Sequence, residues 1–364
     1  MRKLLFISLS LFLAVPLFAR EKEEKYAITD EVAWFEITYR KPAEAPESKD
    51  LPLISVKENR FVDPEGNPVL FRGANIADPD QLEFDGHWNR ELFAFIKDMG
   101  ADLVRIPVHP AAWRRRGADD YLHLLDQAAA WATGLEMYLI IDWHSIGNLK
   151  TGLFQHPMYD TSIPETSRFW HTIARHFQGH NTVAFYEIYN EPAMYRGQLG
   201  KFTWSEWKEI NEEMITIIRY FDKEVIPLVA GLDWAYDLSF LRYDPLDVAG
   251  IGYVTHPYPN KRPEPWETRW EENFAFAAMK WPVIATEIGF WSPEGEDEVI
   301  DDDHYGNRIT RFLEERGISW VAWVLDPLWH PNMLEDWDFN LSPQGEFFKE
   351  AMQRDPAPPI PWKQ

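Results

Sequence analysis

The sequence predicts one α/β domain, a (β/α)8 barrel with a short hairpin at its start, and two observations favour this fold. Eight strand-like segments are nearly continuous apolar runs, which is typical of parallel strands covered by helices. Helical patterns separate most of these runs, in the alternation that a barrel needs. A doubly wound open sheet is the alternative, and it is disfavoured because no glycine-rich phosphate loop follows any of the runs.

The N-terminus has the pattern of an export signal. Arg2 and Lys3 precede an apolar stretch, Leu4 to Phe18, that is short for a membrane span. We therefore expect residues 1–19 to be a signal peptide and the mature protein to be secreted or periplasmic. An uncleaved membrane anchor is the alternative. The chain contains no cysteine, so it forms neither disulfides nor a thiolate metal site.

The rest of the chain divides into three parts. Residues 20–52 form a charged extension, residues 53–352 form the barrel domain, and residues 353–364 form a proline-rich tail. The domain begins with an alternating apolar pattern over 54–75, which predicts a hairpin. Its turn is expected at the sequence DPEGN, residues 63–67, because these residue types favour turns.

The barrel elements are predicted from hydrophobic periodicity and from residues typical of helix ends. Thr203 followed by Glu206 is a capping-box pattern, and Ser342-Pro343 is a typical helix start. The interval after the fifth strand shows the faintest helical pattern. Strands are expected at 69–74, 102–108, 137–142, 183–189, 226–231, 248–254, 282–287 and 318–324. Helices are expected at 87–100, 120–134, 166–179, 203–223, 307–317 and 342–353.

Composition restricts the partners that the protein can bind. The formal net charge of −23 repels nucleic acid and anionic membranes, so neither is an expected partner once the signal is removed. A neutral or cationic substrate is compatible with this charge. The 18 tryptophans suit a protein that stacks on flat apolar faces, such as those of sugar rings. The sequence does not indicate an oligomeric state.

Residues typical of active sites occur on several predicted strands or just beyond their ends, and in a barrel chemistry belongs at the carboxyl ends of the strands. Burying so many polar groups in a purely structural core is costly, so we expect them to converge on one site. In chain order they are Arg105, Asp142, His144, Asn190, Glu191, His256, Tyr258, Glu287 and Trp323.

Two of these residues, Glu191 and Glu287, supply what cleavage of a glycosidic bond needs. One carboxyl group must be a protonated acid at the leaving oxygen, and the other must be an ionised nucleophile or base. Their surroundings must therefore separate their pKa values. Arg105 could keep one carboxylate ionised. Asn190 is placed to bind a substrate hydroxyl.

Other interpretations of the same residues remain open at this point. Glu191 could be an ordinary turn residue beside a proline, and Trp323 could belong to the core. Asp142 is expected to be a structural hydrogen-bond partner rather than a catalyst. The rival chemistry is a metal site formed by Asp142, His144 and His256. It is disfavoured because the set lacks a compact two-histidine motif.

Five segments resemble glycoside hydrolase family 5, the cellulase and mannanase family of retaining barrel glycosidases, and the similarity runs from about Ile54 to Met352. The segments are FRGAN, IIDWHS, YEIYNEP, ATEIGF and SPQGEFFKE. The resemblance implies that Glu191 is the acid/base, Glu287 the nucleophile and Trp323 a stacking platform. It also implies supporting roles for Arg105, His144, Asn190, His256 and Tyr258. The segment VLDPLW, residues 324–329, departs from the polar run common in the family's cellulases, which leaves the neighbouring subsite open.

The resemblance implies a retaining hydrolase for a β-linked polysaccharide or oligosaccharide, without a metal or organic cofactor. A β-1,4-glucan is the first expectation. Alternatives are β-mannan, xyloglucan and mixed-linkage glucan, with endo or exo action, and transglycosylation in place of hydrolysis. An alternative from another class is a barrel that binds carbohydrate without reacting, because a fold does not guarantee a function.

Overall fold

The computed structural model describes residues 50–193, 199–290 and 302–359, all within the compact unit Ile37–Gln364. The predicted signal peptide, most of the predicted extension and the end of the tail lie outside the described residues. None of the helices in the described ranges is both long enough and apolar enough to span a membrane.

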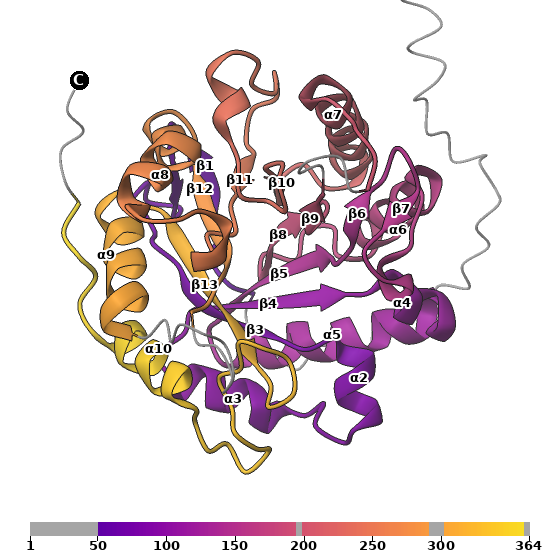
Figure 1. Cartoon of the computed structure of the whole chain (residues 1–364). Helices are drawn as coiled ribbons and strands as arrows, with labels where there is room; N and C mark the ends of the chain where they lie inside the picture. Colours follow the sequence, from indigo (N-terminus) through magenta and orange to yellow (C-terminus); the bar gives the residue numbers. More distant parts are fainter. Residues whose placement is uncertain (1–49, 194–198, 291–301, 360–364) are drawn as a thin grey trace, which may run out of the picture. The chain divides into compact units, whose positions relative to one another are not determined.

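Eight parallel strands close into a barrel, which confirms the predicted fold class (Figure 1). Each runs through a predicted apolar segment, although the first is β3 at Arg72–Ile76 rather than at 69–74. The register pairs Asn75 with Arg105 and Asp142 with Glu187, so polar side chains of neighbouring strands lie together. The strands are β3, β4 (Leu103–Val108), β5 (Tyr138–Trp143), β8 (Val183–Glu187), β10 (Ile226–Ala230), β11 (Gly252–Val254), β12 (Val283–Ile288) and β13 (Ser319–Leu325).

Helices surround the barrel, and the six predicted ones are present. The capping box of Thr203 and Glu206 forms as expected, and the Ser342 side chain accepts a hydrogen bond from the Gly345 backbone. The faint pattern after β10 is only a 3₁₀ turn, Ser239–Arg242. The predicted helices are α3 (Arg90–Asp98), α5 (Ala118–Gly134), α6 (Ile163–His176), α7 (Trp204–Phe221), α9 (Asn307–Glu315) and α10 (Pro343–Gln353). Three further helices were not predicted: α2 (Pro79–Phe84), α4 (Pro110–Arg116) and α8 (Trp266–Asn273).

The N-terminal hairpin exists and the predicted turn forms, but the strand ladder lies before this turn rather than across it. Strands β1 (Ser55–Lys57) and β2 (Arg60–Val62) pair antiparallel around Glu58-Asn59, where Glu58 has a φ of 55°. Residues 63–67 do form a turn, but the chain beyond it makes only a single bridge, from Val62 to Pro68. Proline has no N–H to donate to a ladder, and from Arg72 onward the chain pairs with barrel strands instead.

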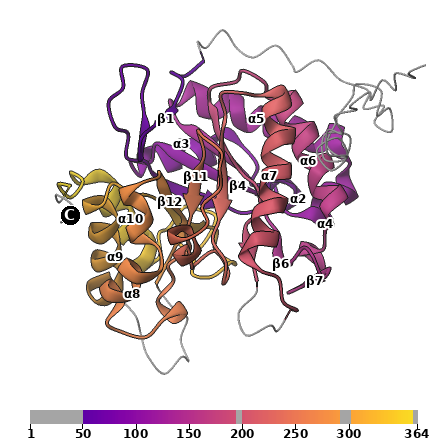
Figure 2. The same ribbon diagram turned by 90° about the horizontal axis from the view of Figure 1, so that it is seen from above.

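This hairpin packs against the inside of the barrel, and its side chains join the core. The ring of Phe61 contacts that of Phe185 edge-on, with centroids 5.0 Å apart, and both belong to one buried cluster with Leu103 and Ile140. Figure 2 shows β1 at one end of the barrel and the small strands β6 (Ile146–Asn148) and β7 (Leu153–Phe154) at the other. The end beside β6 is therefore left open for a site.

Candidate active site

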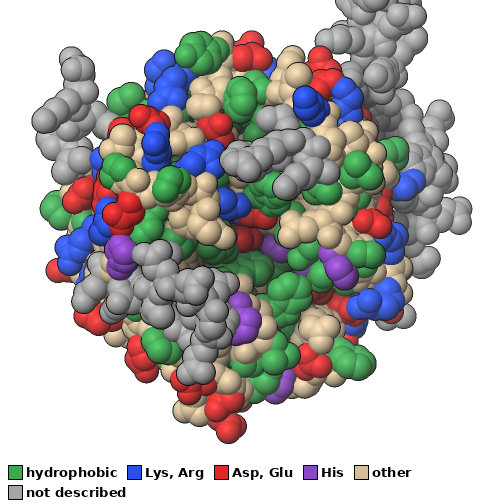
Figure 3. Space-filling model, in the orientation of Figure 1, with side chains coloured by type: hydrophobic (Ala, Val, Ile, Leu, Met, Phe, Trp, Pro, Cys, Tyr) green, Lys and Arg blue, Asp and Glu red, His purple; other side chains and the backbone are tan. Residues whose placement is uncertain are grey.

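The carboxyl ends of the barrel strands border a cavity of about 530 Å³ (Figure 3). Figure 3 shows a hollow with acidic and histidine side chains in it and hydrophobic side chains beside it. Arg105 and His256, which do not line this cavity, are fully buried and hydrogen-bond to residues that do. The predicted residues that line it are His144, Asn190, Glu191, Tyr258, Glu287 and Trp323. The structure therefore brings all eight predicted site residues together.

Glu191 is positioned by a small sheet beyond the barrel rim. After β8 the chain forms β9 (Glu191–Pro192), which pairs in parallel with β6 so that Glu191 lies opposite Ile146. The Glu191 backbone N–H also donates to the Ser145 carbonyl at 3.0 Å. Beyond the predicted strand 183–189, the chain thus leaves the barrel at Asn190-Glu191-Pro192 while its backbone stays hydrogen-bonded.

Arg105 organises the floor of the site. It is fully buried, and its guanidinium donates two hydrogen bonds to Glu187, at 2.7 and 3.0 Å. It also donates to Glu287 Oε1 at 3.0 Å and to Asn190 Oδ1 at 2.7 Å. Burial lowers the pKa of Arg105, but the carboxylates of Asp142, Glu187 and Glu287 raise it overall, so the group stays a cation. One cation thus orients both a candidate nucleophile and the amide beside the candidate acid.

Asn190 is oriented with its amide nitrogen available. Because Oδ1 accepts from Arg105, the geometry assigns Nδ2 to the other side of the amide. Nδ2 is buried and has no hydrogen-bond partner among the described residues. A buried donor without a partner is costly, and a substrate hydroxyl at the cavity wall would satisfy it.

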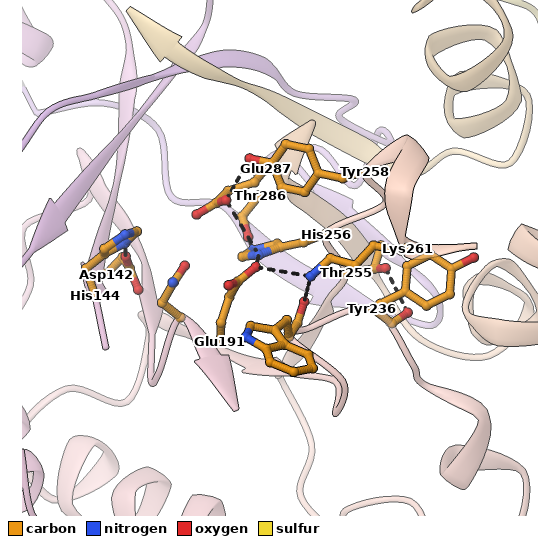
Figure 4. Close-up of polar contacts among 12 residues, drawn as sticks. Asp142, His144, Glu191, Tyr236, Thr255, His256, Tyr258, Lys261, Thr286 and Glu287 are labelled. Carbon is orange, nitrogen blue, oxygen red and sulfur yellow. Dashed lines mark hydrogen bonds and ion pairs between the residues drawn. The ribbon is translucent and has the colours of Figure 1, made fainter. Parts of the chain in front are cut away.

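Two donors hold the Glu287 carboxyl group. Oε1 accepts from Arg105, and Oε2 accepts from the Tyr258 hydroxyl at 2.8 Å (Figure 4). Burial raises the pKa of Tyr258 well above its usual value, so this hydroxyl keeps its proton and remains a donor. Burial also raises the pKa of Glu287, against the lowering effect of His256 and Arg105. Glu287 is therefore expected to become ionised at a higher pH than an exposed glutamate, and both of its contacts favour the ionised form.

Glu191 shares a hydrogen bond with His256. Glu191 Oε1 lies 3.0 Å from His256 Nδ1 and 3.7 Å from the Lys261 ammonium. Burial raises the pKa of Glu191, but Lys261 and His256 lower it below its usual value. Burial lowers the pKa of His256, but the carboxylates of Glu287, Glu187 and Glu191 raise it to about 9. The two groups titrate as a pair, and this pair retains one proton at neutral pH.

Asp142 has the structural role that the sequence predicts. Its Oδ2 lies 2.7 Å from His144 Nδ1, and burial, together with the charges of His109, Arg105 and His256, lowers the pKa of His144 well below its usual value. The neutral His144 ring lies parallel to Trp323, with centroids 5.5 Å apart. This packing fixes the face of Trp323 at the cavity wall.

The alternative metal site is not supported by the described residues. Asp142, His144 and His256 do not form a ligand cluster there, whereas Glu191, His256 and Glu287 offer atoms within 4.8 Å of one another. In that set both ring nitrogens of His256 already have hydrogen-bonding partners, Glu191 and Thr286. The cluster is therefore better described as a proton-sharing group than as a set of free ligands.

Sequence reasoning missed several residues of the site. Glu187 and Thr286 are buried beneath the site. Glu187 could have been found from the sequence, because a charged residue inside an apolar strand is unusual. Lys261 follows the predicted Tyr258 but carries no motif. Its ammonium donates to the Trp234 carbonyl at 3.3 Å, where Asp233, Trp234 and Ala235 have φ values of 60°, 55° and 59°. No sequence pattern predicts three consecutive non-glycine residues with positive φ.

The separation of the two carboxyl groups indicates which chemistry the site can perform. A carboxylate oxygen of Glu191 lies within 4.8 Å of one of Glu287. Carboxyl groups about 5–5.5 Å apart are typical of retaining glycosidases, whereas inverting enzymes keep about 6.5–9.5 Å for a water molecule. A parallel barrel with this pair at its open end has the arrangement that is typical of retaining glycosidases.

Comparison with known proteins agrees with this class. The family model for cellulases of glycosyl hydrolase family 5 matches residues 62–328. The structure of a β-glucanase from Saccharophagus degradans is 45% identical in sequence, with a TM-score of 0.83, and the match covers 88% of this chain and 98% of that one. The chain belongs to glycosyl hydrolase family 5.

Curated relatives are more distant. Endoglucanase A of Butyrivibrio fibrisolvens is 24% identical over 75% of this chain, and endoglucanase E-5 of Thermobifida fusca is 25% identical over 74% of it. The matched regions span 60% and 55% of those two proteins, so each relative is longer than the part it shares with this chain.

Proposed function

We propose that the protein is an exported retaining glycoside hydrolase that cleaves β-1,4-linked glucan, acting as an endoglucanase. The observation that carries the proposal is the close pair of carboxyl groups, each held by different partners: Glu287 by Arg105 and Tyr258, and Glu191 by His256. The Saccharophagus β-glucanase has been crystallised with cellotetraose, which supports a β-glucan as the substrate class. The N-terminal sequence of residues 1–19 supports export.

In the proposed mechanism, Glu287 attacks the anomeric carbon while the leaving oxygen receives a proton from Glu191. The C–O bond breaks as the bond between Glu287 and the sugar forms. Water then attacks the same carbon, Glu191 accepts a proton from that water, and Glu287 is released. Asn190 Nδ2 binds a hydroxyl of the reacting sugar, and Trp323 stacks on the ring of the sugar. Neither of these steps calls for a metal ion or an organic cofactor.

A panel of polysaccharides tests the proposal. Reducing-sugar release would be measured on carboxymethyl-cellulose, barley β-glucan, xyloglucan, glucomannan and galactomannan, at enzyme concentrations far below the substrate. Release from the first two, with a rapid fall in viscosity, is expected. Release from glucomannan and galactomannan alone would indicate a mannanase instead of a glucanase. If no reducing sugar were released from any of the five polysaccharides, a barrel that binds carbohydrate without cleaving it would be favoured.

Lys261 is expected to lower the pH at which activity is lost on the alkaline side. A nearby cation favours loss of the proton shared by Glu191 and His256, so Lys261→Met should let the pair keep that proton to higher pH. We expect the alkaline limb of the kcat/KM profile, set by the pKa of about 9 for His256, to move upward. The shift should be roughly 0.5–1 pH unit, or about 1 kcal/mol.

The matched control is Lys261→Arg, which retains the cation and should keep the limb in place. The measurement is kcat/KM against pH on a soluble glucan. An alkaline limb that stays fixed or moves downward in Lys261→Met would show that the ammonium does not act on the pair.

A further inference from the structure

A chain of hydrogen bonds connects the acid/base pair to a carboxylate outside the cavity. Glu187 Oε1 accepts from the Thr286 hydroxyl at 3.0 Å. Thr286 Oγ1 in turn lies 2.9 Å from His256 Nε2 (Figure 4). The other ring nitrogen, Nδ1, contacts Glu191. Glu187, Thr286 and His256 are all fully buried, so water is not available to replace any of these contacts.

The direction of each hydrogen bond follows from counting protons. Both oxygens of Glu187 accept from Arg105, and the pKa of Glu187 is lowered because Arg105 and His256 outweigh the effect of burial. Glu187 is therefore ionised and can only accept. The single hydroxyl proton of Thr286 goes to Glu187, which leaves Oγ1 as an acceptor for His256. His256 Nε2 must then carry a proton in both of its charge states.

This fixes which nitrogen of His256 can lose its proton. With Nε2 always protonated, Nδ1 is the atom that titrates, and it faces Glu191 Oε1 at 3.0 Å. The hydrogen bond between them contains one proton, held by His256 as a cation or by Glu191 as an acid. Without Thr286, Nε2 loses its acceptor, so the imidazolium is less stable and the pair gives up its shared proton at lower pH, while the proton of a neutral ring can then lie on either nitrogen.

We propose that Thr286 and Glu187 are positioning residues that fix the tautomer of His256, so that the Glu191–His256 pair stores the proton for the leaving oxygen. This inference rests on the proposed function. In the first step the electron pair of the broken C–O bond takes this proton through Glu191, as Glu287 bonds to the sugar. In the second step a proton of the attacking water returns to the pair, and the bond between Glu287 and the sugar breaks.

Other charged and titratable groups also act on this pair, and their charges are unchanged in the test below. Lys261 approaches the Glu191–His256 pair from the loop after β11. Arg105, Glu187 and Glu287 act on the pair from the barrel strands. The remaining groups are Asp142, His144, Tyr159 and Tyr258.

The test compares Thr286→Val with Thr286→Ser, which keeps the hydroxyl. On a glucan, whose leaving oxygen needs a proton, kcat/KM of Thr286→Val should fall about 10- to 100-fold at pH 8. On a dinitrophenyl cellobioside, whose leaving group needs no proton, kcat/KM should change by less than about 3-fold. The alkaline limb on glucan should move to lower pH, because the imidazolium loses its acceptor. Thr286→Ser should behave like the wild type.

Thr255→Val is the matched control. Thr255 is a buried threonine next to His256, and its hydroxyl donates to the Tyr236 carbonyl at 3.2 Å, outside the chain of hydrogen bonds (Figure 4). Thr255→Val should leave the ratio of kcat/KM on glucan to kcat/KM on the dinitrophenyl cellobioside unchanged. Equal losses of Thr286→Val on both substrates would indicate a displaced Glu287 and would overturn the proposal, as would full activity on glucan at pH 8.

Nitrogen NMR of the imidazole groups provides a test on the unmodified protein that does not depend on the activity of any variant. The His256 signals, assigned by their loss in His256→Gln, should show Nε2 protonated on both sides of pH 9 and only Nδ1 titrating. An unprotonated Nε2 above pH 9 would overturn the proposal. This measurement does not depend on activity. A wild type inactive on every glycan and on the aryl glycoside would therefore reject the proposed function without deciding the tautomer.

Discussion

Glu287→Gln is expected to reduce kcat/KM by about 10⁴- to 10⁶-fold, on glucan and on a dinitrophenyl cellobioside alike. The amide has the size of the carboxylate but cannot form the glycosyl-enzyme, and every substrate of a retaining enzyme needs that bond. Arg105 keeps its two hydrogen bonds to Glu187, so its charge remains compensated. The free energy of unfolding, measured with urea, should therefore stay equal or rise, because one buried negative charge beside Glu191 is removed.

The control for this variant is Glu65→Gln, a change of the same kind at an exposed turn residue. It should retain wild-type kinetics. If Glu287→Gln kept more than about 1% of wild-type activity, contamination being excluded by active-site titration, Glu287 would not be the nucleophile.

Glu191→Gln is expected to reduce kcat/KM much more on glucan than on the dinitrophenyl cellobioside. On glucan kcat/KM should fall about 10³-fold, because the leaving oxygen no longer receives a proton. On the dinitrophenyl cellobioside kcat/KM should fall by less than about 10-fold, since this constant reports only the steps up to formation of the glycosyl-enzyme. Its kcat should fall further, because the second step lacks a base, and the released dinitrophenol should show a burst equal to the enzyme concentration.

Uniform loss on both substrates would contradict this assignment of Glu191. In that case Glu191 would support binding of the substrate, and the burst would be absent. The same pair of substrates is used for Thr286→Val, where the effect is smaller because Glu191 itself is retained. The three variants together distinguish loss of the nucleophile, loss of the acid and loss of the group that orients its partner.

Much of the fold could be predicted because the pattern that specifies it is local. Each barrel strand is an apolar run, since parallel strands are buried on both faces. Glycine and capping residues mark helix ends, as at Thr203 and Ser342. The start of the barrel was misplaced because residues 63–67 are a good turn sequence, and only the pairing of β3 with its neighbours decides where the chain leaves the hairpin.

The candidate site was predictable to the extent that its residues lie at strand ends. Glu191 and Glu287 are far apart in sequence, yet a closed barrel brings the ends of its strands to one opening. Glu187 was missed, although it is a charged residue inside the predicted strand 183–189, because the prediction considered only the residues that close each strand. Lys261 was missed because its effect depends on a distance of 3.7 Å that no spacing implies.

By itself the sequence determined the barrel and the set of groups available at its open end, because strand order and side-chain identity are properties of the chain. Only the tertiary structure decided how those groups share protons. Arg105 occupies both oxygens of Glu187, which forces the Thr286 hydroxyl to donate there and leaves His256 Nδ1 to face Glu191. Proton positions depend on contacts within about 3 Å among residues from β4, β8, β9 and β12 and from the segment after β11. Such contacts exist only after the barrel has closed.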